Sequence, residues 1–426
     1  MNKAVIKQII LEQKEEIKEF SQSKIIERKV EKKARRAVKD KLIKIILGVR
    51  RSGKSVLAHQ ILKDKNYGYI NFDDERLAGV KANDLNDFLE VFLLLNEKVE
   101  YLLFDEIQNV EGWELFVNRL KRQGYNIVVT GSNSKLLSKE MATHLTGRHI
   151  AIELFPFSFQ EFLIYKNFKY SANDFYLTRK RASIKKLLAE YLKQGGFPEL
   201  FNVEFKEQYL RDLYGRIASQ DIAARHHIKY VNTLKEITLY AMSNFGSRIT
   251  YHKFKNIFEI KSVHTIKNYL EYLEEAYLIF LISPFSYKLK SRLRGPKKIY
   301  AIDTGMINAI APRNSPDTGK ILENLVFLEL KRREKEIYFF NDYANNEVDF
   351  AIKEGVKIKQ LIQVCKTLEN YDTKKREIKS LIKAGKELKC NNLFIIAYDE
   401  EGEEKVNGKK IKIIPLWKWL LENDKN

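Results

Sequence analysis

Residues 48–55 read Gly-Val-Arg-Arg-Ser-Gly-Lys-Ser, which has the spacing G-x-x-x-x-G-K-S of a phosphate-binding loop. A glycine at each end lets the backbone turn tightly, so that successive N–H groups point inward at a polyphosphate. In such a loop Lys54 reaches the β- and γ-phosphates, and the hydroxyl of Ser55 ligates Mg²⁺. We expect the nucleotide-contacting residues of the loop to be Gly48, Arg50, Arg51, Ser52, Gly53, Lys54, Ser55 and Val56.

The segments on either side of this loop favour the same interpretation. The short run 44–47 is mostly apolar, as a buried strand should be, and residues 56–63 have helical spacing. A strand, a loop and a helix in this order place the anion at the N-terminus of the helix. The alternative is a chance match of the motif in a turn that contains Gly and Ser. Such a match would not require a strand before it and a helix after it.

A second apolar run, residues 99–104, ends in two carboxylates, Asp105 and Glu106. A buried strand that ends in two acids needs a cation or a reacting water there, because unpaired buried charge is costly. We expect Asp105 to hold the Mg²⁺ and Glu106 to polarise the attacking water as general base. The alternative is a strand capped by solvated acids, and the preceding phosphate-binding loop argues against it.

A third apolar run, residues 126–130, is followed by Gly-Ser-Asn-Ser. This polar end is expected beside the γ-phosphate, where Ser132 or Asn133 would sense the loss of that group. Spacing does not choose between the two side chains. An ordinary polar loop after a buried strand is the alternative.

The chain resembles a known family through these three segments and through three further motifs, Leu-Thr-Gly-Arg at 145–148, Leu-Phe-Pro-Phe-Ser-Phe at 154–159 and Gly-Gly-Phe-Pro at 195–198. Together they are similar to AAA+ ATPases of archaea and bacteria that carry a C-terminal domain related to PD-(D/E)XK nucleases. The resemblance implies ATP and Mg²⁺ as cofactors. It implies that Arg148 is an arginine finger or a γ-phosphate sensor, and that residues 195–198 form a turn of a helical lid. A structural arginine that pairs with Glu153 or a backbone carbonyl is the alternative for Arg148.

Composition limits the remaining possibilities. With 426 residues, of which 44% are hydrophobic, the chain can form several cores. Its two cysteines, Cys365 and Cys390, have no paired spacing, which argues for a reducing cytoplasm and against a zinc or disulfide framework. We expect a cytoplasmic protein with no signal peptide and no membrane span, because no apolar run reaches about 18 residues.

The net charge of +20 favours a polyanionic partner, although a solvated lysine-rich surface is the alternative. Residues 24–41 form a dense basic run in which Ile26, Val30, Ala34 and Val38 recur every four residues. This spacing predicts a helix that buries its apolar side and leaves the cations facing water.

Residues 231–296 look like a winged helix, in the order helix, turn, helix and basic hairpin. Ser262 is a plausible N-cap, and His264, Lys267 and Asn268 would lie on the exposed face of a recognition helix that reaches a DNA major groove. The basic wing that would touch phosphates consists of Lys288, Lys290, Arg292, Arg294, Lys297 and Lys298. The alternative is a winged helix used only for packing between domains.

The C-terminal third partly resembles PD-(D/E)XK nucleases, in which acids hold Mg²⁺ and a lysine orients the water. Glu323 on a helix, Asp349 on a strand and Gln363 on the next strand match the pattern in part, with Lys366 as the lysine. Gln363 stands where the family has an acid. Cys365 stands where it has the lysine, and Lys366 follows one position too late, so it points to the opposite strand face. We interpret this region as a nuclease-like fold with a structural or binding role, and an active nuclease is the alternative.

The sequence thus predicts an α/β protein with four domains: an AAA+ P-loop core with an N-terminal helical extension at 1–160, a helical lid at 161–230, a winged helix at 231–296 and a nuclease-like domain at 297–426. The leading hypothesis for function is an ATP-driven switch or remodeller that acts on DNA or on a DNA-bound partner. The two alternatives are an ATP-regulated nuclease and a nucleotide-dependent protein-binding scaffold. A homo-oligomer follows if Arg148 is supplied by a neighbouring copy.

Overall fold

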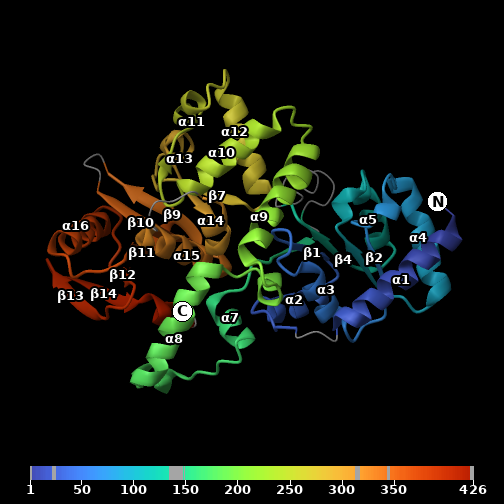
Figure 1. The fold of residues 1–426 in the computed structure, drawn as a ribbon, viewed down its shortest axis with the longest axis horizontal. Coiled ribbons are helices and arrows are strands. Elements are labelled where there is room, and N and C mark those ends of the chain that lie inside the picture. Colours follow the sequence, from blue (N-terminus) through green and yellow to red (C-terminus); the bar gives the residue numbers. More distant parts are fainter. Residues whose placement is uncertain are drawn as a thin grey trace. The chain divides into compact units, whose positions relative to one another are not determined.

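The computed structural model describes residues 2–21, 25–133, 147, 149–311, 317–342 and 346–422 (Figure 1). The chain forms two compact units, one of Met1–Pro156 with Glu275–Tyr277 and one of Phe157–Glu274 with Leu278–Asn426. The boundary at Pro156 lies close to residue 160, where the nucleotide-binding core was predicted to end. The finer division of the second unit into a lid, a winged helix and a C-terminal domain stays a prediction.

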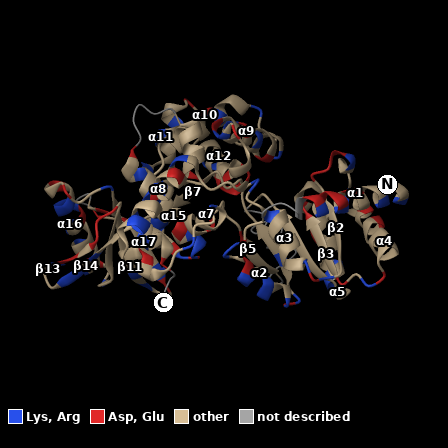
Figure 2. Ribbon diagram, turned by 60° about the horizontal axis from the view of Figure 1, so that its bottom comes forward, with Lys and Arg blue, Asp and Glu red and all other residues tan. Residues whose placement is uncertain are grey.

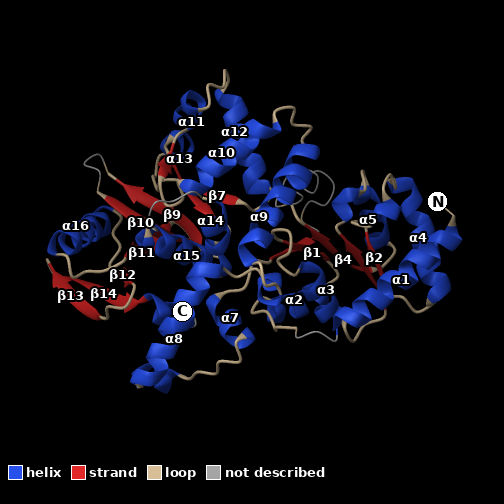
Figure 3. Ribbon diagram, in the orientation of Figure 1, coloured by secondary structure: helices blue, strands red, loops and turns tan. Residues whose placement is uncertain are grey.

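The first unit is built on a five-stranded parallel sheet with the order β2-β3-β4-β1-β5 (Figure 3). The strands are β1 Ile43–Leu47, β2 Tyr67–Asn71, β3 Tyr101–Asp105, β4 Asn126–Gly131 and β5 His149–Glu153. All strands of a parallel sheet end at the same edge, so the polar residues that follow β1, β3 and β4 are brought to one place. This sheet confirms the predicted α/β class.

Helices cover both faces of this sheet. They are α1 Lys3–Ser21, α2 Glu31–Val38, α3 Lys54–Leu62, α4 Leu85–Leu95 and α5 Trp113–Arg122. On one face α2 and α3 bury a core in which Leu57 packs with Leu103 and Ile152. Phe104 points to the opposite face, because successive strand residues alternate, and it packs edge-on against Phe116 of α5.

The basic run before the sheet folds largely as predicted. Ala34 and Val38 are buried on α2, and Lys32 and Arg36 are exposed. The helix begins only at Glu31, however, so the helical spacing does not extend back to Arg28. Arg28 is buried, which corrects the expectation that all these cations face water.

The second unit begins with helices α7 Phe159–Tyr165, α8 Thr178–Gln194 and α9 Lys206–Arg216, followed by a π-helical turn at Ile217–Ala224. The next elements are α10 Val231–Ser243, β6 Arg248–Ile249, α11 Tyr251–Ile257, α12 Val263–Glu275, β7 Ile279–Ile282, α13 Leu289–Arg294 and β8 Lys297–Ala301. The strands form an antiparallel sheet with the order β6-β8-β7. The predicted hairpin is therefore present as β7 and β8, but its connection contains the short helix α13, which the sequence analysis did not predict.

The C-terminal part has a six-stranded mixed sheet with the order β13-β14-β12-β11-β10-β9. Its elements are α14 Thr304–Ile310, α15 Thr318–Arg332, β9 Glu336–Asn341, β10 Glu347–Glu354, β11 Lys357–Cys365, α16 Tyr371–Glu387, β12 Leu393–Ala397, β13 Gly402–Val406, β14 Lys409–Pro415 and α17 Leu416–Leu421. The predicted helix around Glu323 and the predicted strands around Asp349 and Gln363 are confirmed as α15, β10 and β11.

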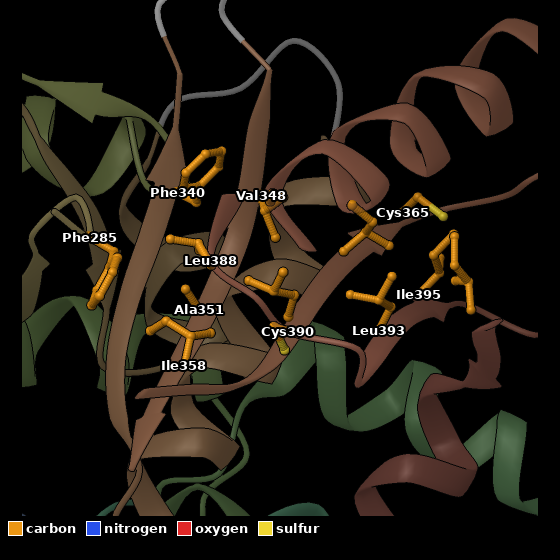
Figure 4. Close-up of a cluster of buried hydrophobic side chains, with 14 of the residues drawn as sticks. Phe285, Phe340, Val348, Ala351, Ile358, Cys365, Leu388, Cys390, Leu393 and Ile395 are labelled. Carbon is orange, nitrogen blue, oxygen red and sulfur yellow. The ribbon is translucent and has the colours of Figure 1, made fainter. Parts of the chain in front are cut away.

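A hydrophobic core fills the space between this sheet and α16 (Figure 4). It contains Val348 and Ala351 of β10, Leu381 and Ala384 of α16, and the free thiol of Cys365. Phe350, next to Ala351, points to the opposite face and packs against Tyr300 of β8, which in turn stacks on Phe327 of α15. Both faces of the C-terminal sheet are thus covered. Among the helices described by the structure, none has the length and apolar composition needed to cross a membrane.

The Gly-Gly-Phe-Pro motif forms a turn after α8 that is held by Asp303. The Asp303 carboxylate accepts a hydrogen bond from Gly196 N at 2.7 Å and caps α14 by accepting one from Met306 N at 3.0 Å. Gly195 has φ +81°, and a Cβ there would lie 2.0 Å from Asp303 Oδ1. The motif therefore fastens α8 to α14, which explains why the first residue of the turn must be glycine.

Gly195→Ala is expected to destabilise the second unit by about 2 kcal/mol or more, because it combines a left-handed backbone strain with loss of the Asp303 cap. Gly215→Ala is the matched control, since Gly215 lies inside α9 with no atom near its added Cβ. That control should gain roughly 0.5–1 kcal/mol. Chemical denaturation of the two variants measures the difference, and equal stabilities would contradict the role of Asp303.

Candidate functional site

The phosphate-binding loop runs from the end of β1 to the start of α3, and both of its glycines have a structural reason. A Cβ on Gly48 would lie 2.1 Å from the carbonyl oxygen of Leu154, so only glycine permits this close approach. Gly53 has φ +92° and ψ +29° and stands immediately before the first residue of α3, Lys54. The loop N–H groups thus lead into a helix N-terminus, which is the expected anion-binding geometry.

Lys54 is buried and forms an ion pair with Glu106, whose Oε1 lies 3.2 Å from Lys54 Nζ. Burial raises the pKa of Glu106, but the charge of Lys54 and the hydrogen bond from Gln108 outweigh it, so the net pKa is lowered. Glu106 therefore stays ionised near neutral pH. Its backbone has φ +48° and ψ +41°, a left-handed conformation that is uncommon for a non-glycine residue and is characteristic of functional sites.

Asp105, the last residue of β3, is buried within a hydrogen-bonded group. The hydroxyl of Thr130 donates to Asp105 Oδ1, and Tyr69 donates to Oδ2 at 3.4 Å. Burial and the charge of Glu106 raise the pKa of Asp105, whereas a hydrogen bond with Ser55 lowers it. Ser55 and Asp105, the two residues predicted to bind Mg²⁺, are therefore in contact. A hydroxyl and a carboxylate at the end of a phosphate-binding loop fit a magnesium ion.

Two buried hydroxyls at this edge of the sheet have no hydrogen-bond partner among the described residues, Ser52 Oγ in the loop and Ser132 Oγ after β4. Buried polar atoms are nearly always hydrogen-bonded, so each of these hydroxyls has room for a bond to water or to a polar ligand. Asn133, the alternative to Ser132 as the sensing residue, is also buried. The orphaned hydroxyls fit a polyphosphate in the loop.

The other predicted loop residues lie in different surroundings. Arg50 donates to Asp73 Oδ2 at 2.9 Å. Arg51 is exposed and has φ +65°, and Val56 is half-buried in the first turn of α3. Arg148 lies outside the described residues.

Sequence reasoning missed Arg28, whose guanidinium braces the loop. Arg28 Nη1 donates to the carbonyl oxygen of Ser52 at 2.9 Å, and Nη2 donates to that of Phe155 at 2.5 Å. One side chain thereby joins the phosphate-binding loop to the segment that follows β5. No local signal distinguishes Arg28 from its neighbours in the basic run, because its burial depends on residues far away in the sequence.

A second polar cluster lies in the second unit and includes two of the predicted nuclease-like residues. The ammonium of Lys298 contacts Glu323 Oε1 at 2.7 Å, Glu347 Oε1 at 2.7 Å and Asp349 Oδ1 at 2.8 Å. Burial lowers the pKa of Lys298, but the surrounding carboxylates outweigh it and hold the pKa well above its ordinary value. Lys298 was predicted to touch phosphates as part of the basic wing. It lies instead on β8 with a buried side chain, because its charge is paired with carboxylates inside the unit.

Gln363 joins this cluster through hydrogen bonds. Its Oε1 accepts from Asp349 N at 3.2 Å, and its Nε2 donates to Glu377. Lys366 is exposed and follows the end of β11, so it does not join Glu323, Asp349 and Gln363, which corrects its place in the predicted set. Within the described part of the chain, no three His, Cys, Asp or Glu side chains are arranged, as they stand, to hold a metal ion.

Comparison with known proteins agrees with the first site. A family model for an AAA domain matches residues 40–163, which contain the loop, β3 and β4. Two domains of unknown function, DUF8612 and DUF4143, match residues 185–317 and 318–419. The second of these matches ends within α17 and covers all six strands of the C-terminal sheet.

Two proteins are similar over most of this chain. The protein MJ1544 of Methanocaldococcus jannaschii is 42% identical over 439 residues, which cover 98% of this chain and 96% of that protein. A protein of Haemophilus influenzae is 34% identical over 333 residues, which cover 74% of this chain and 80% of that protein. The chain therefore belongs to the family that these two proteins represent, and its residues 40–163 match an AAA domain.

Some solved structures are similar to this chain, at lower sequence identity than these two proteins. A Walker-type ATPase of Pyrococcus abyssi is 14% identical, with 67% of this chain and 96% of that chain covered and a TM-score of 0.43. The Orc1 protein of Aeropyrum pernix, solved in complex with DNA, is 10% identical, with 67% and 92% covered and a TM-score of 0.27. These scores are too low to support conclusions about this chain.

Arg28→Met is expected to weaken nucleotide binding about tenfold, because Arg28 braces the phosphate-binding loop. The change removes both hydrogen bonds from the guanidinium to the carbonyl oxygens of Ser52 and Phe155, and a hydrogen bond from a charged group contributes about 1.5–3 kcal/mol. Arg36→Met, on the exposed side of α2, is the matched control. Titration with a fluorescent ATP analogue measures both, and unchanged affinity in a folded Arg28→Met protein would show that the loop does not need this brace.

Proposed function

We propose that the protein binds Mg·ATP at the carboxyl edge of the five-stranded sheet, hydrolyses it, and uses the cycle as a switch or remodeller acting on DNA or a DNA-bound partner. The observation that supports nucleotide binding is the meeting of Lys54 and Ser55 with Asp105 and Glu106, from two separate segments, at one edge of the sheet of an AAA domain. This set supplies a phosphate-binding cation, two magnesium ligands and a base.

The ion pair between Lys54 and Glu106 supports a specific order of events. An incoming triphosphate offers Lys54 a stronger anion than one carboxylate, so Lys54 turns to the phosphate oxygens. Glu106 then loses its partner and is available to orient a water molecule as general base. Ser55 and Asp105 would hold Mg²⁺, which would neutralise charge on the phosphates.

Lys54→Ala is expected to nearly abolish ATP binding, because it removes the cation that would face the phosphates and leaves Glu106 without its ion-pair partner. Glu106→Gln should keep binding and lower turnover by about 10²-fold or more, since it removes the base and keeps the magnesium ligands. Lys63→Ala, at the exposed C-terminal end of α3, is the control for the loss of one positive charge. ATP binding and phosphate release measure these effects, and wild-type turnover in Glu106→Gln would exclude its role as base.

The DNA part of the proposal is supported by the region from α10 to β8. Its order of helix, strand, two helices and an antiparallel pair of strands supports the predicted winged helix. His264 and Lys267 are exposed on α12, and Asn268 is half-buried. The backbone N–H of His264 donates a hydrogen bond to Ser262 Oγ at 3.2 Å, which supports the predicted N-cap.

The cations of the proposed wing fall into two groups. Lys288, Lys290 and Arg294 are exposed on and around α13. Arg292 donates to the hydroxyl of Tyr338 at 2.5 Å, and Lys297 donates to Ser283 Oγ at 2.8 Å, so both are engaged within the unit. Figure 2 shows Lys and Arg mixed with Asp and Glu on helices of both units, so net charge alone does not locate a surface for DNA.

Replacing Lys288, Lys290 and Arg294 by Ala is expected to make the salt dependence of duplex DNA binding shallower. Each phosphate contact contributes a slope of roughly −0.9 in log affinity against log salt, so the triple variant should lose about two to three units. A control that replaces Lys375, Lys379 and Lys386 of α16, all exposed, removes the same charge elsewhere. If both triple variants keep the wild-type slope, the wing does not bind phosphates, and a protein-binding scaffold becomes the better proposal.

Arg148 belongs to this proposal as an arginine finger supplied by a second copy of the chain. An arginine finger stabilises the negative charge of the transition state and is not needed for nucleotide affinity. Specific activity that rises with protein concentration would support this assignment and, with it, a homo-oligomer.

A further inference from the structure

The side chain of Lys298 ends in a cage of carboxylates. Lys298 is 1% exposed, and its ammonium lies 2.7 Å from Glu323 and Glu347 and 2.8 Å from Asp349. An ammonium has three N–H donors, and here each has a carboxylate oxygen. The carboxylates come from α15 and from β10, and the lysine comes from β8, so three elements meet at one cation.

Each of these carboxylates has a further partner besides Lys298. Asp349 Oδ2 accepts a hydrogen bond from Val364 N at 2.9 Å. Glu347 Oε2 lies 3.2 Å from Nε of Arg248. Glu323 Oε1 accepts a further hydrogen bond from the hydroxyl of Tyr300 at 2.7 Å. The polar network is therefore well satisfied, and such a network is rigid and specific in its geometry.

The charges nearly balance without any further ion. Lys298 and Arg248 supply two cations to the carboxylates of Glu323, Glu347 and Asp349. A second, divalent cation would meet repulsion from Lys298 at close range.

The distances distinguish an ammonium cage from a metal site. Oxygens 2.7–2.8 Å from the central atom match a charge-assisted hydrogen bond from nitrogen. Magnesium would need them at about 2.0–2.1 Å. Carboxylates that converge from separate elements are nevertheless the ligands that hard divalent cations prefer, so truncation of the lysine would leave a site that such a cation can fill after a small contraction.

We propose that Lys298 is the resident cation of this cluster: its ammonium takes the position in which a divalent cation would otherwise bind. The cluster then serves as a permanent lock between β8 and the C-terminal sheet, and the C-terminal domain does not carry out metal-dependent cleavage. The proposal does not depend on ATP hydrolysis. It distinguishes the leading function from the alternative of an ATP-regulated nuclease.

The test is Mn²⁺ binding to the nucleotide-free, full-length protein, measured by electron paramagnetic resonance. The proteins compared are the wild type, Asp349→Asn, Lys298→Ala and the double variant. Asp349→Asn is expected to leave Mn²⁺ binding as it is in the wild type. Lys298→Ala should gain one bound Mn²⁺ per chain, and the double variant should lose it again. Any Mn²⁺ bound at the nucleotide site contributes equally to all four.

Three outcomes would overturn the proposal. The first is a wild-type Mn²⁺ site that Asp349→Asn removes. The second is wild-type cleavage of duplex DNA that requires Mn²⁺ and is lost in Asp349→Asn. The third is a folded Lys298→Ala protein that gains no site. If Lys298→Ala fails to fold, the comparison of wild type with Asp349→Asn still decides, because it needs no change at the lysine.

Discussion

The ion pair between Lys54 and Glu106 is the interaction on which the first unit is organised. Lys54 is buried and Glu106 is half-buried, and the pair joins the start of α3 to the residue that follows β3. A buried pair of this kind is stable only where the remaining polar atoms are satisfied. Thr130 meets this need for the neighbouring Asp105 by donating to its carboxylate, and for Glu106 by accepting from its backbone N–H at 3.0 Å. Three strands are thereby held at one edge of the sheet.

Arg28 extends this organisation to the end of the unit. Its contacts with Ser52 and Phe155 tie the phosphate-binding loop to the residue just before the boundary at Pro156. The carbonyl oxygen of Leu154 also packs against Gly48 so closely that no side chain fits. A change in the loop on nucleotide binding is thus expected to reach the segment that leaves the unit. The second unit is fixed by comparable buried polar contacts, Asp303 at the Gly195 turn and Lys298 in its carboxylate cage.

The sequence was sufficient wherever a function depends on residues at fixed short spacing. The phosphate-binding loop, the acids after β3 and the polar end of β4 were predicted because each follows directly from a strand and its own neighbours. The structure places Ser55 next to Asp105, and Glu323 near Asp349, as the patterns indicate. The assignment of chemistry to these groups stays a prediction.

Residues whose role depends on long-range contacts were not predictable in this way. Arg28 and Lys298 both stand in runs of cations, and runs of cations are usually solvated, so nothing local marked them as buried. Helix α13 was missed because a short basic segment between two strands has the composition of a hairpin loop. Lys366 was considered for the nuclease-like site from its position in the sequence, whereas a lysine from another strand, Lys298, reaches the acids in space.

We propose that a nucleotide cycle at the edge of the first sheet serves an action on DNA. The most direct measurement is the rate of Mg·ATP hydrolysis by the full-length wild-type protein, with and without duplex DNA. We expect measurable turnover of ATP that increases when duplex DNA is added. This increase should disappear as added salt weakens the contacts with DNA phosphates. Turnover that is absent, or that is the same with and without DNA at low salt, would contradict it.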